Sequence, residues 1–151
     1  MNKHKEFLLL MKKCDYDLAA YIVLPYCSKD IRVDLILKCV KNTPLRANRG
    51  TLEDVEKFIS GYRNGNVSEL KLKEVVARLY NRSNASAREN TIFSILMFIL
   101  TDLHKDNWSD SANAIHYIHG HFWNDDYAKD LLFEISSVVW PQKSLMGAIY
   151  G

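Results

Sequence analysis

The chain has 151 residues, 48% of them hydrophobic, which is enough for one domain over residues 1–151 with a core that needs no metal or disulfide. Its net charge is only +2, from 20 basic and 18 acidic residues. Three cysteines, an odd number at no metal-ligand spacing, argue against a disulfide framework or a zinc module and fit a reducing compartment with buried thiols.

Two apolar stretches bear on cellular location. The run at residues 7–11 is shorter than the apolar region of a secretion signal, and no small-residue cleavage site follows it. Residues 91–103 are apolar on nearly all sides, but a membrane span needs about 20 such residues. We therefore expect a cytoplasmic protein that does not enter a membrane, with the second stretch forming a buried central helix.

The first third of the chain predicts three helices. A short helix covers residues 5–13, and a second covers residues 16–24 and ends there because the ring of Pro25 disfavours helical geometry in the preceding residue. Ser28 caps a third helix, whose apolar residues recur at helical spacing and form one stripe of Val33, Ile36, Leu37 and Val40.

The remaining elements follow the same period. Thr51 begins a helix that Gly65 ends, and Asn66 with Glu69 forms a capping box for the next. An apolar helix then spans residues 86–104, and a last one begins at Ser109, is broken and restarted at 124–126, and stops before Pro141. The fold class that follows is all-α: a single compact helical bundle of six or seven helices around a central apolar helix.

Charge is unevenly distributed along the chain. Residues 1–50 have ten basic and five acidic residues, a balance of +5, whereas residues 101–151 have three and seven, a balance of −4. This asymmetry predicts a bipolar molecule that attracts charged partners.

The acidic last third also holds most of the aromatic side chains that could anchor a partner. Rings bury large areas at low entropic cost, and carboxylates accelerate approach to a basic protein. We predict a partner-binding surface made of Asp102, Asp106, Trp108, Asp110, His116, Tyr117, His119, Trp123, Asp125, Asp126 and Tyr127. The competing interpretation is structural, because Asp106, Asp110 and Asp125 lie at or before helix starts, where carboxylates cap amide groups.

Metal binding and catalysis have weaker support in the sequence. His116 and His119 are three residues apart and share a helix face, as two metal ligands would, but no carboxylate stands at ligand spacing beside them. Cys27 precedes a helix start, where a thiol pKa could fall, yet no base is placed near it by the sequence. Without a Gly-rich phosphate loop or a His-Glu-x-x-His motif, we expect no metal, no cofactor and no enzymatic activity.

Basic residues suggest a different partner. They are Lys3, Lys5, Lys12, Lys13, Lys38, Lys41, Arg46, Arg49, Arg78, Arg82 and Arg88. A nucleic-acid binder would gather such charges on one face to neutralise phosphates. Acidic neighbours such as Asp15, Asp17, Asp30 and Asp34 dilute the field, and no helix-turn-helix pattern stands out.

One ordered series of segments carries a resemblance. It consists of Asp17-Leu18-Ala19-Ala20-Tyr21-Ile22-Val23-Leu24-Pro25, Asp30-Ile31-Arg32 at a helix start, residues 52–65 ending in glycine, and Asn84-Ala85-Ser86-Ala87-Arg88-Glu89. Over about residues 15–104 the chain resembles a family of small helical immunity proteins of bacterial polymorphic toxin systems. It has fewer alanines than that family, and we find no matching motif after His104.

The resemblance implies a cytosolic, non-enzymatic binder that neutralises a toxin without a cofactor. Combined with the charge asymmetry, it predicts a stoichiometric inhibitor that covers the active site or substrate channel of a basic toxin or nuclease. The alternative is a phage-type counter-defence or nucleic-acid-associated protein that uses the basic N-terminal half.

Overall fold

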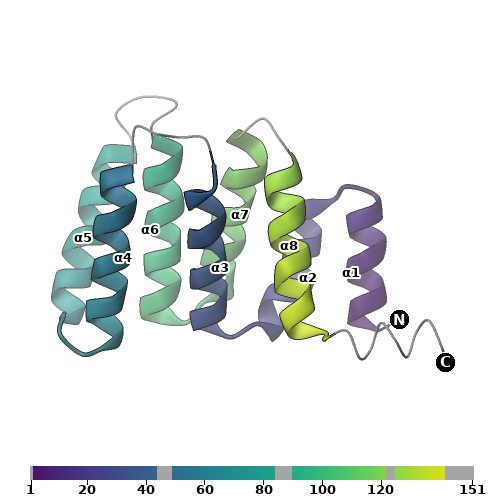
Figure 1. Cartoon of the computed structure of the whole chain (residues 1–151), viewed down its shortest axis with the longest axis horizontal. Coiled ribbons are helices and arrows are strands. Elements are labelled where there is room, and N and C mark those ends of the chain that lie inside the picture. The colour runs from purple at the N-terminus through teal and green to yellow at the C-terminus, as the bar shows by residue number, and fades with distance from the viewer. Residues whose placement is uncertain (1, 44–48, 84–89, 122–124, 142–151) are drawn as a thin grey trace.

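A computed structural model describes residues 2–43, 49–83, 90–121 and 125–141. These residues form eight α-helices and one 3-10 helix, and no strand occurs among them (Figure 1). The elements are α1 (Lys3–Lys12), α2 (Tyr16–Val23), η1 (Leu24–Tyr26), α3 (Lys29–Lys41), α4 (Arg49–Arg63), α5 (Glu69–Ser83), α6 (Asn90–Lys105), α7 (Trp108–His121) and α8 (Asp125–Val139). The predicted all-α class is confirmed, whereas the predicted number of six or seven helices is wrong.

The additional helix arises at the acidic break near the end of the chain. The sequence pattern was read as one helix interrupted at residues 124–126, but α7 ends at His121 and α8 begins at Asp125 as a separate element. The two helices also have different neighbours: α7 packs mainly on α6, whereas α8 packs on α2 and α3. Each therefore contributes its own face to the core.

The helices lie side by side in two rows (Figure 1). One row contains α4, α3 and α8, the other contains α5, α6, α7 and α2, and α1 closes one end. The predicted central helix is confirmed as α6, which contacts α5, α7 and α3. Its six core residues, Ile92, Ile95, Leu96, Ile99, Leu100 and Leu103, are almost completely shielded from solvent. The predicted start of this helix at residues 86–89 lies outside the described residues.

Turn chemistry explains where two helices end. Pro25 lies inside η1, directly after α2, as expected from its ring. Gly65 has a φ of 76°, donates its N–H to the Tyr62 carbonyl at 3.1 Å, and is followed by Asn66, whose N–H reaches the Gly61 carbonyl at 2.8 Å. This pair of bonds is the Schellman motif, which satisfies the last carbonyls of α4.

Helix starts were predicted less accurately than helix ends. The structure begins α4 at Arg49, so Thr51 lies inside the helix rather than capping it. The cap of α5 is Ser68, whose Oγ accepts the Lys71 N–H at 3.2 Å, and not Asn66 two residues earlier. Ser28 does precede α3 as predicted, but its side chain makes no capping bond.

Charges that are far apart along the chain are close together in space. Helices α2 and α3 from the basic third pack directly against α7 and α8 from the acidic third. Lys38 of α3 and Glu134 of α8, for example, form an ion pair at 2.7 Å. Some charges from the basic first third and the acidic last third therefore pair across the α3–α8 contact.

None of the helices in the described ranges combines the length and the apolar character needed to cross a bilayer.

Candidate interaction surface

A buried arginine links the first and last thirds of the chain. Arg32 on α3 donates from Nε and Nη2 to the two carboxylate oxygens of Asp102 on α6, at 2.9 and 2.7 Å. Its Nη1 donates to the carbonyl of Cys27 at 2.5 Å, and the hydroxyl of Ser111 on α7 donates to the same Asp102 carboxylate. The site thereby ties α3, α6 and α7 together through charge-assisted bonds.

This network removes one residue from the predicted partner-binding surface. Asp102 is 0% exposed, and both of its carboxylate oxygens accept hydrogen bonds inside the core. Burial acts to lower the pKa of Arg32, but the hydrogen bonds that it donates to Asp102 and Asp106 outweigh this effect and raise that pKa. Asp102 is thus a structural residue that compensates a buried cation, and not a contact for a partner.

Asp106 belongs to both the network and the surface. It follows the last residue of α6 with a φ of 51°, a left-handed conformation that short polar side chains tolerate. Its Oδ1 accepts from Arg32 Nη2 at 2.8 Å, while its side chain remains 67% exposed. A structural role, the competing interpretation of Asp106, therefore accounts for its contact with Arg32. The aspartate lies at the end of a helix, however, and not at the predicted helix start.

Two histidines bridge α7 to its neighbours through carboxylates. His116 Nδ1 lies 3.0 Å from Asp17 Oδ2, and His119 Nδ1 lies 3.8 Å from the other oxygen of the same aspartate. His119 Nε2 in turn lies 3.2 Å from Asp125 Oδ1. The rings of Tyr16 and His119 also meet in a T-shaped arrangement, with centroids 5.2 Å apart. One chain of polar contacts thus joins α2, α7 and the start of α8.

The same contacts bear on metal binding. Asp17, which is not part of the predicted surface, supplies the carboxylate that His116 and His119 lack at ligand spacing in the sequence. Even so, no group of three or more potential ligands within the described ranges has the geometry to hold a metal ion. The arrangement fits histidines and carboxylates that hold one another in a fixed orientation.

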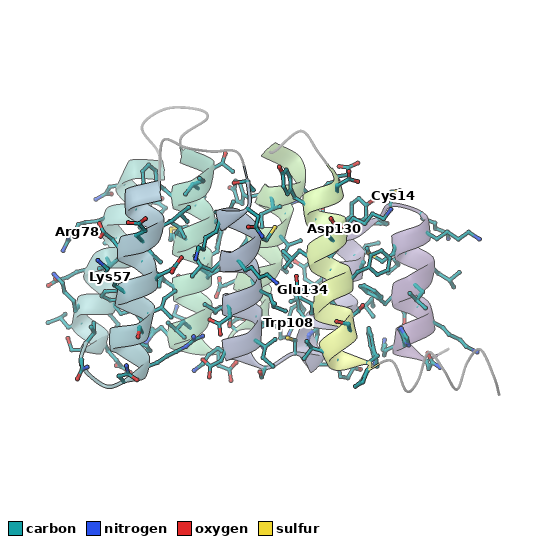
Figure 2. The ribbon with its side chains drawn as sticks, in the orientation of Figure 1. Cys14, Lys57, Arg78, Trp108, Asp130 and Glu134 are labelled. Carbon is teal, nitrogen blue, oxygen red and sulfur yellow. The ribbon has the colours of Figure 1, made fainter. Side chains whose placement is uncertain are left out.

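Aromatic side chains continue this surface toward the start of α7. The rings of Trp108 and Tyr21 meet edge to face with centroids 5.3 Å apart, and Figure 2 shows Trp108 behind the front row of helices. On α2, Leu18 and Tyr21 are 53% and 46% exposed. We call the residues Asp17, Leu18, Tyr21, Trp108, His116, His119, Asp125 and Asp126 the α2–α7–α8 surface.

The other predicted residues have different surroundings. Tyr117 stacks on Phe98 with centroids 5.6 Å apart and is half-buried. Tyr127 is also half-buried, and its backbone carbonyl lies 3.7 Å from the Cys39 sulfur. Burial raises the pKa of Asp110. Trp123 lies outside the described residues.

Sequence reasoning missed Leu18 and Tyr21 as surface residues. Three residues apart on a helix, they share a face, and both interrupt the pattern of buried Ala19, Ala20 and Val23. That signal was present, but the predicted helix at residues 16–24 was not examined for exposed apolar side chains. Their exposure creates an apolar part of the surface that the acidic third alone does not provide.

Some basic side chains of the chain pair with nearby acids, whereas others stay exposed. Lys41 pairs with Glu56 at 2.8 Å, and Arg63 pairs with Asp30 and Asp34 at 3.0 and 2.7 Å. Lys38 pairs with Glu134, and Arg32 is in the core. Arg46 and Arg88 lie outside the described residues. Lysines of α1 stay exposed, as do Lys57 and Arg78, which Figure 2 shows near the α4–α5 end.

The cysteines differ in exposure. Burial raises the pKa of Cys27 and, together with Glu134 and Asp130, raises the pKa of Cys39 to about 12. The shift at Cys27 is opposite to the one that activation at a helix start would require. Cys14, in contrast, is exposed, so the expectation that all three thiols are buried is wrong for this residue.

Comparison of the chain with family models, with curated proteins and with solved structures finds no match. The resemblance to immunity proteins therefore stays a prediction that comes from the residue pattern alone.

Proposed function

We propose that this chain is a non-enzymatic inhibitor that binds a basic toxin or nuclease in a stoichiometric complex and covers its active site. The observation that carries the proposal is the α2–α7–α8 surface, where exposed Leu18 and Tyr21 lie on the same helix as Asp17, with Asp125 and Asp126 close by on α8. Apolar anchors next to carboxylates are typical of interfaces that bind basic proteins.

The surface is built on helices that are held in place. His119 lies between Asp17 of α2 and Asp125 of α8, at 3.8 and 3.2 Å, so three helices share one polar contact chain. Rigid presentation limits the entropy that an interface loses on binding. This supports a surface that is already formed before the partner arrives.

The resemblance to immunity proteins supports the identity of the partner. An acidic surface is complementary to the basic groove that a nuclease needs for its phosphodiester substrate. Covering that groove inhibits without chemistry, which agrees with the expectation of a protein that is not an enzyme.

The test is co-expression with the open reading frame immediately upstream. We expect growth rescue, a 1:1 complex by size-exclusion chromatography, and loss of both in charge-reversed Asp125→Lys/Asp126→Lys. Tyr21→Ala should weaken binding at least tenfold, because buried aromatic anchors typically contribute about 2 kcal/mol or more. Glu53→Lys/Asp54→Lys is the matched control, since both acids are exposed on α4, away from the surface.

Two outcomes would contradict the proposal. Unchanged affinity of Asp125→Lys/Asp126→Lys at low salt would exclude this surface. Micromolar or tighter binding to duplex DNA or RNA with a steep salt dependence would instead favour the nucleic-acid alternative.

A further inference from the structure

A groove of about 450 Å³ lies between α5 and α6, at a part of the molecule that the proposed function does not use. Small-molecule sites commonly have volumes of 300–1,000 Å³. The groove is lined by Leu72, Lys73, Val76, Ala77, Tyr80 and Asn81 of α5 and by Met97, Thr101, His104 and Lys105 of α6. The lining that the structure describes is mostly apolar, and its charged side chains are Lys73 and Lys105.

The two lysines and His104 gather at one end of the groove. Glu69 Oε1 at the start of α5 lies 4.0 Å from His104 Nδ1 at the end of α6, so the two helices run antiparallel. Lys73, His104 and Lys105 consequently share one end of the groove, while Tyr80 and Met97 lie toward the other. The groove is therefore polarised along its length, from a positive end to an apolar end.

A polar atom at the positive end is unsatisfied. The Nδ1 atom of His104 is buried and makes no hydrogen bond within the described part of the chain, and the side chain is only 18% exposed. Glu69, the nearest carboxylate, does not line the groove, and its side chain is 70% exposed. An anionic group bound at this end would balance the two lysines and add an acceptor near the imidazole.

We propose that the α5–α6 groove binds a medium-chain fatty acid or a similar linear amphiphilic carboxylate. The carboxylate pairs with Lys73 and Lys105, and the aliphatic chain lies against Val76, Ala77 and Met97. The α5 wall from residue 72 to 81 is about 14 Å long at 1.5 Å per residue, which suits a linear chain. A partner helix with acidic flanks would instead require cations along the whole groove, whereas the lining residues that the structure describes at its Tyr80 end include none.

The test is isothermal titration of the full-length chain with decanoate. We expect saturable binding at one site per chain, and no comparable binding of decyltrimethylammonium, which has the same chain and the opposite charge. Shortening the ligand to octanoate should weaken binding by up to about fourfold per CH₂ removed.

Four variants locate the site. Lys73→Gln and Lys105→Gln should each weaken decanoate binding about three- to tenfold, the range expected for losing one partly exposed charge-assisted contact. Ala77→Trp, at an exposed position of α5, should fill the groove and abolish binding while circular dichroism shows an intact fold. Lys57→Gln on α4 should leave binding unchanged.

Three results would overturn the proposal: no saturable binding of decanoate, equal binding of decanoate and decyltrimethylammonium, or unchanged affinity in Lys73→Gln and Lys105→Gln. Binding of an acidic amphipathic peptide that Ala77→Trp blocks, without decanoate binding, would assign the groove to a protein partner instead. None of these results affects the test of the α2–α7–α8 surface, which uses different residues and a different ligand.

Discussion

Arg32 and Asp102 lie 70 residues apart in the sequence and form a bidentate ion pair inside the core, with donor–acceptor distances of 2.9 and 2.7 Å. Removing one partner of a buried pair typically costs about 3–5 kcal/mol, because the other charge is left without compensation. Replacing both partners by apolar residues costs much less, since no charge then remains in the core.

We therefore expect Asp102→Ala to lower the free energy of unfolding by about 3–5 kcal/mol in urea denaturation. The double variant Arg32→Met/Asp102→Leu should be more stable than Asp102→Ala alone. Lys38→Ala, which breaks the exposed pair with Glu134, is the control and should cost less than about 1 kcal/mol. A cost for Asp102→Ala as small as that of Lys38→Ala would show that the buried pair is not stabilised as described.

Gly61 provides a test of close packing at the end of α4. A Cβ added to this glycine would lie 2.8 Å from Cγ2 of Val67. Alanine normally stabilises a helix by about 1 kcal/mol relative to glycine, but overpacking costs about 1–3 kcal/mol. Gly61→Ala should therefore destabilise the wild-type chain and stabilise a Val67→Ala background. Equal effects in both backgrounds, measured by urea denaturation, would argue against this contact.

Two residues, Asn66 and Ser68, could cap the start of α5, and the local sequence alone does not decide between them. Ser68 Oγ accepts the Lys71 N–H at 3.2 Å, so Ser68→Ala should cost about 1 kcal/mol of stability. Asn66→Ala should have little effect on the helix start, because Asn66 lies before the cap. A larger loss from Asn66→Ala than from Ser68→Ala in thermal unfolding would restore the cap that we predicted from the sequence.

Cys39 gives a prediction for alkaline pH. Burial is the main reason that its pKa is raised from 9.0 to about 12, so the folded state keeps this proton when the unfolded state has lost it. The stability that the folded state gains by keeping this proton on Cys39 is fully present below pH 9.0. It is lost as the pH rises toward about 12. Stability measured across this range should fall more steeply for the wild type than for Cys39→Ala.

Alkylation checks the same thiol independently. Iodoacetamide at neutral pH should modify exposed Cys14 first and Cys39 far more slowly, since the thiolate is the reactive form. Equal rates for the two residues in peptide mass analysis would contradict the burial of Cys39.

Local patterns in the sequence predicted most of the fold. The eight apolar residues between Ile92 and Leu100 left no polar face, which marked α6 as the helix to be covered on several sides. Gly65 was predicted as a helix end because few other residues adopt a positive φ there without strain, and the structure has it at 76°. Both signals are contained within a few residues.

Features that depend on distant residues could not be predicted in this way. Asp102 was read as a surface carboxylate because nothing near it in the sequence points to Arg32. The contact between Asp17 and His116 spans 99 residues and is equally invisible to helical period. The predicted surface therefore includes His116 and His119 of α7 but not Asp17 of α2, which the structure places beside them.

The packing of α2 and α3 against α7 and α8 has a consequence for synthesis on the ribosome. A growing polypeptide that ends before Asp125 has no α8, so apolar side chains on α2 and α3 stay open to water. Such intermediates are prone to aggregate until the missing segment emerges. The core can then be completed only after α8 has been synthesised. Truncation before α8 should yield an insoluble product rather than a smaller folded one.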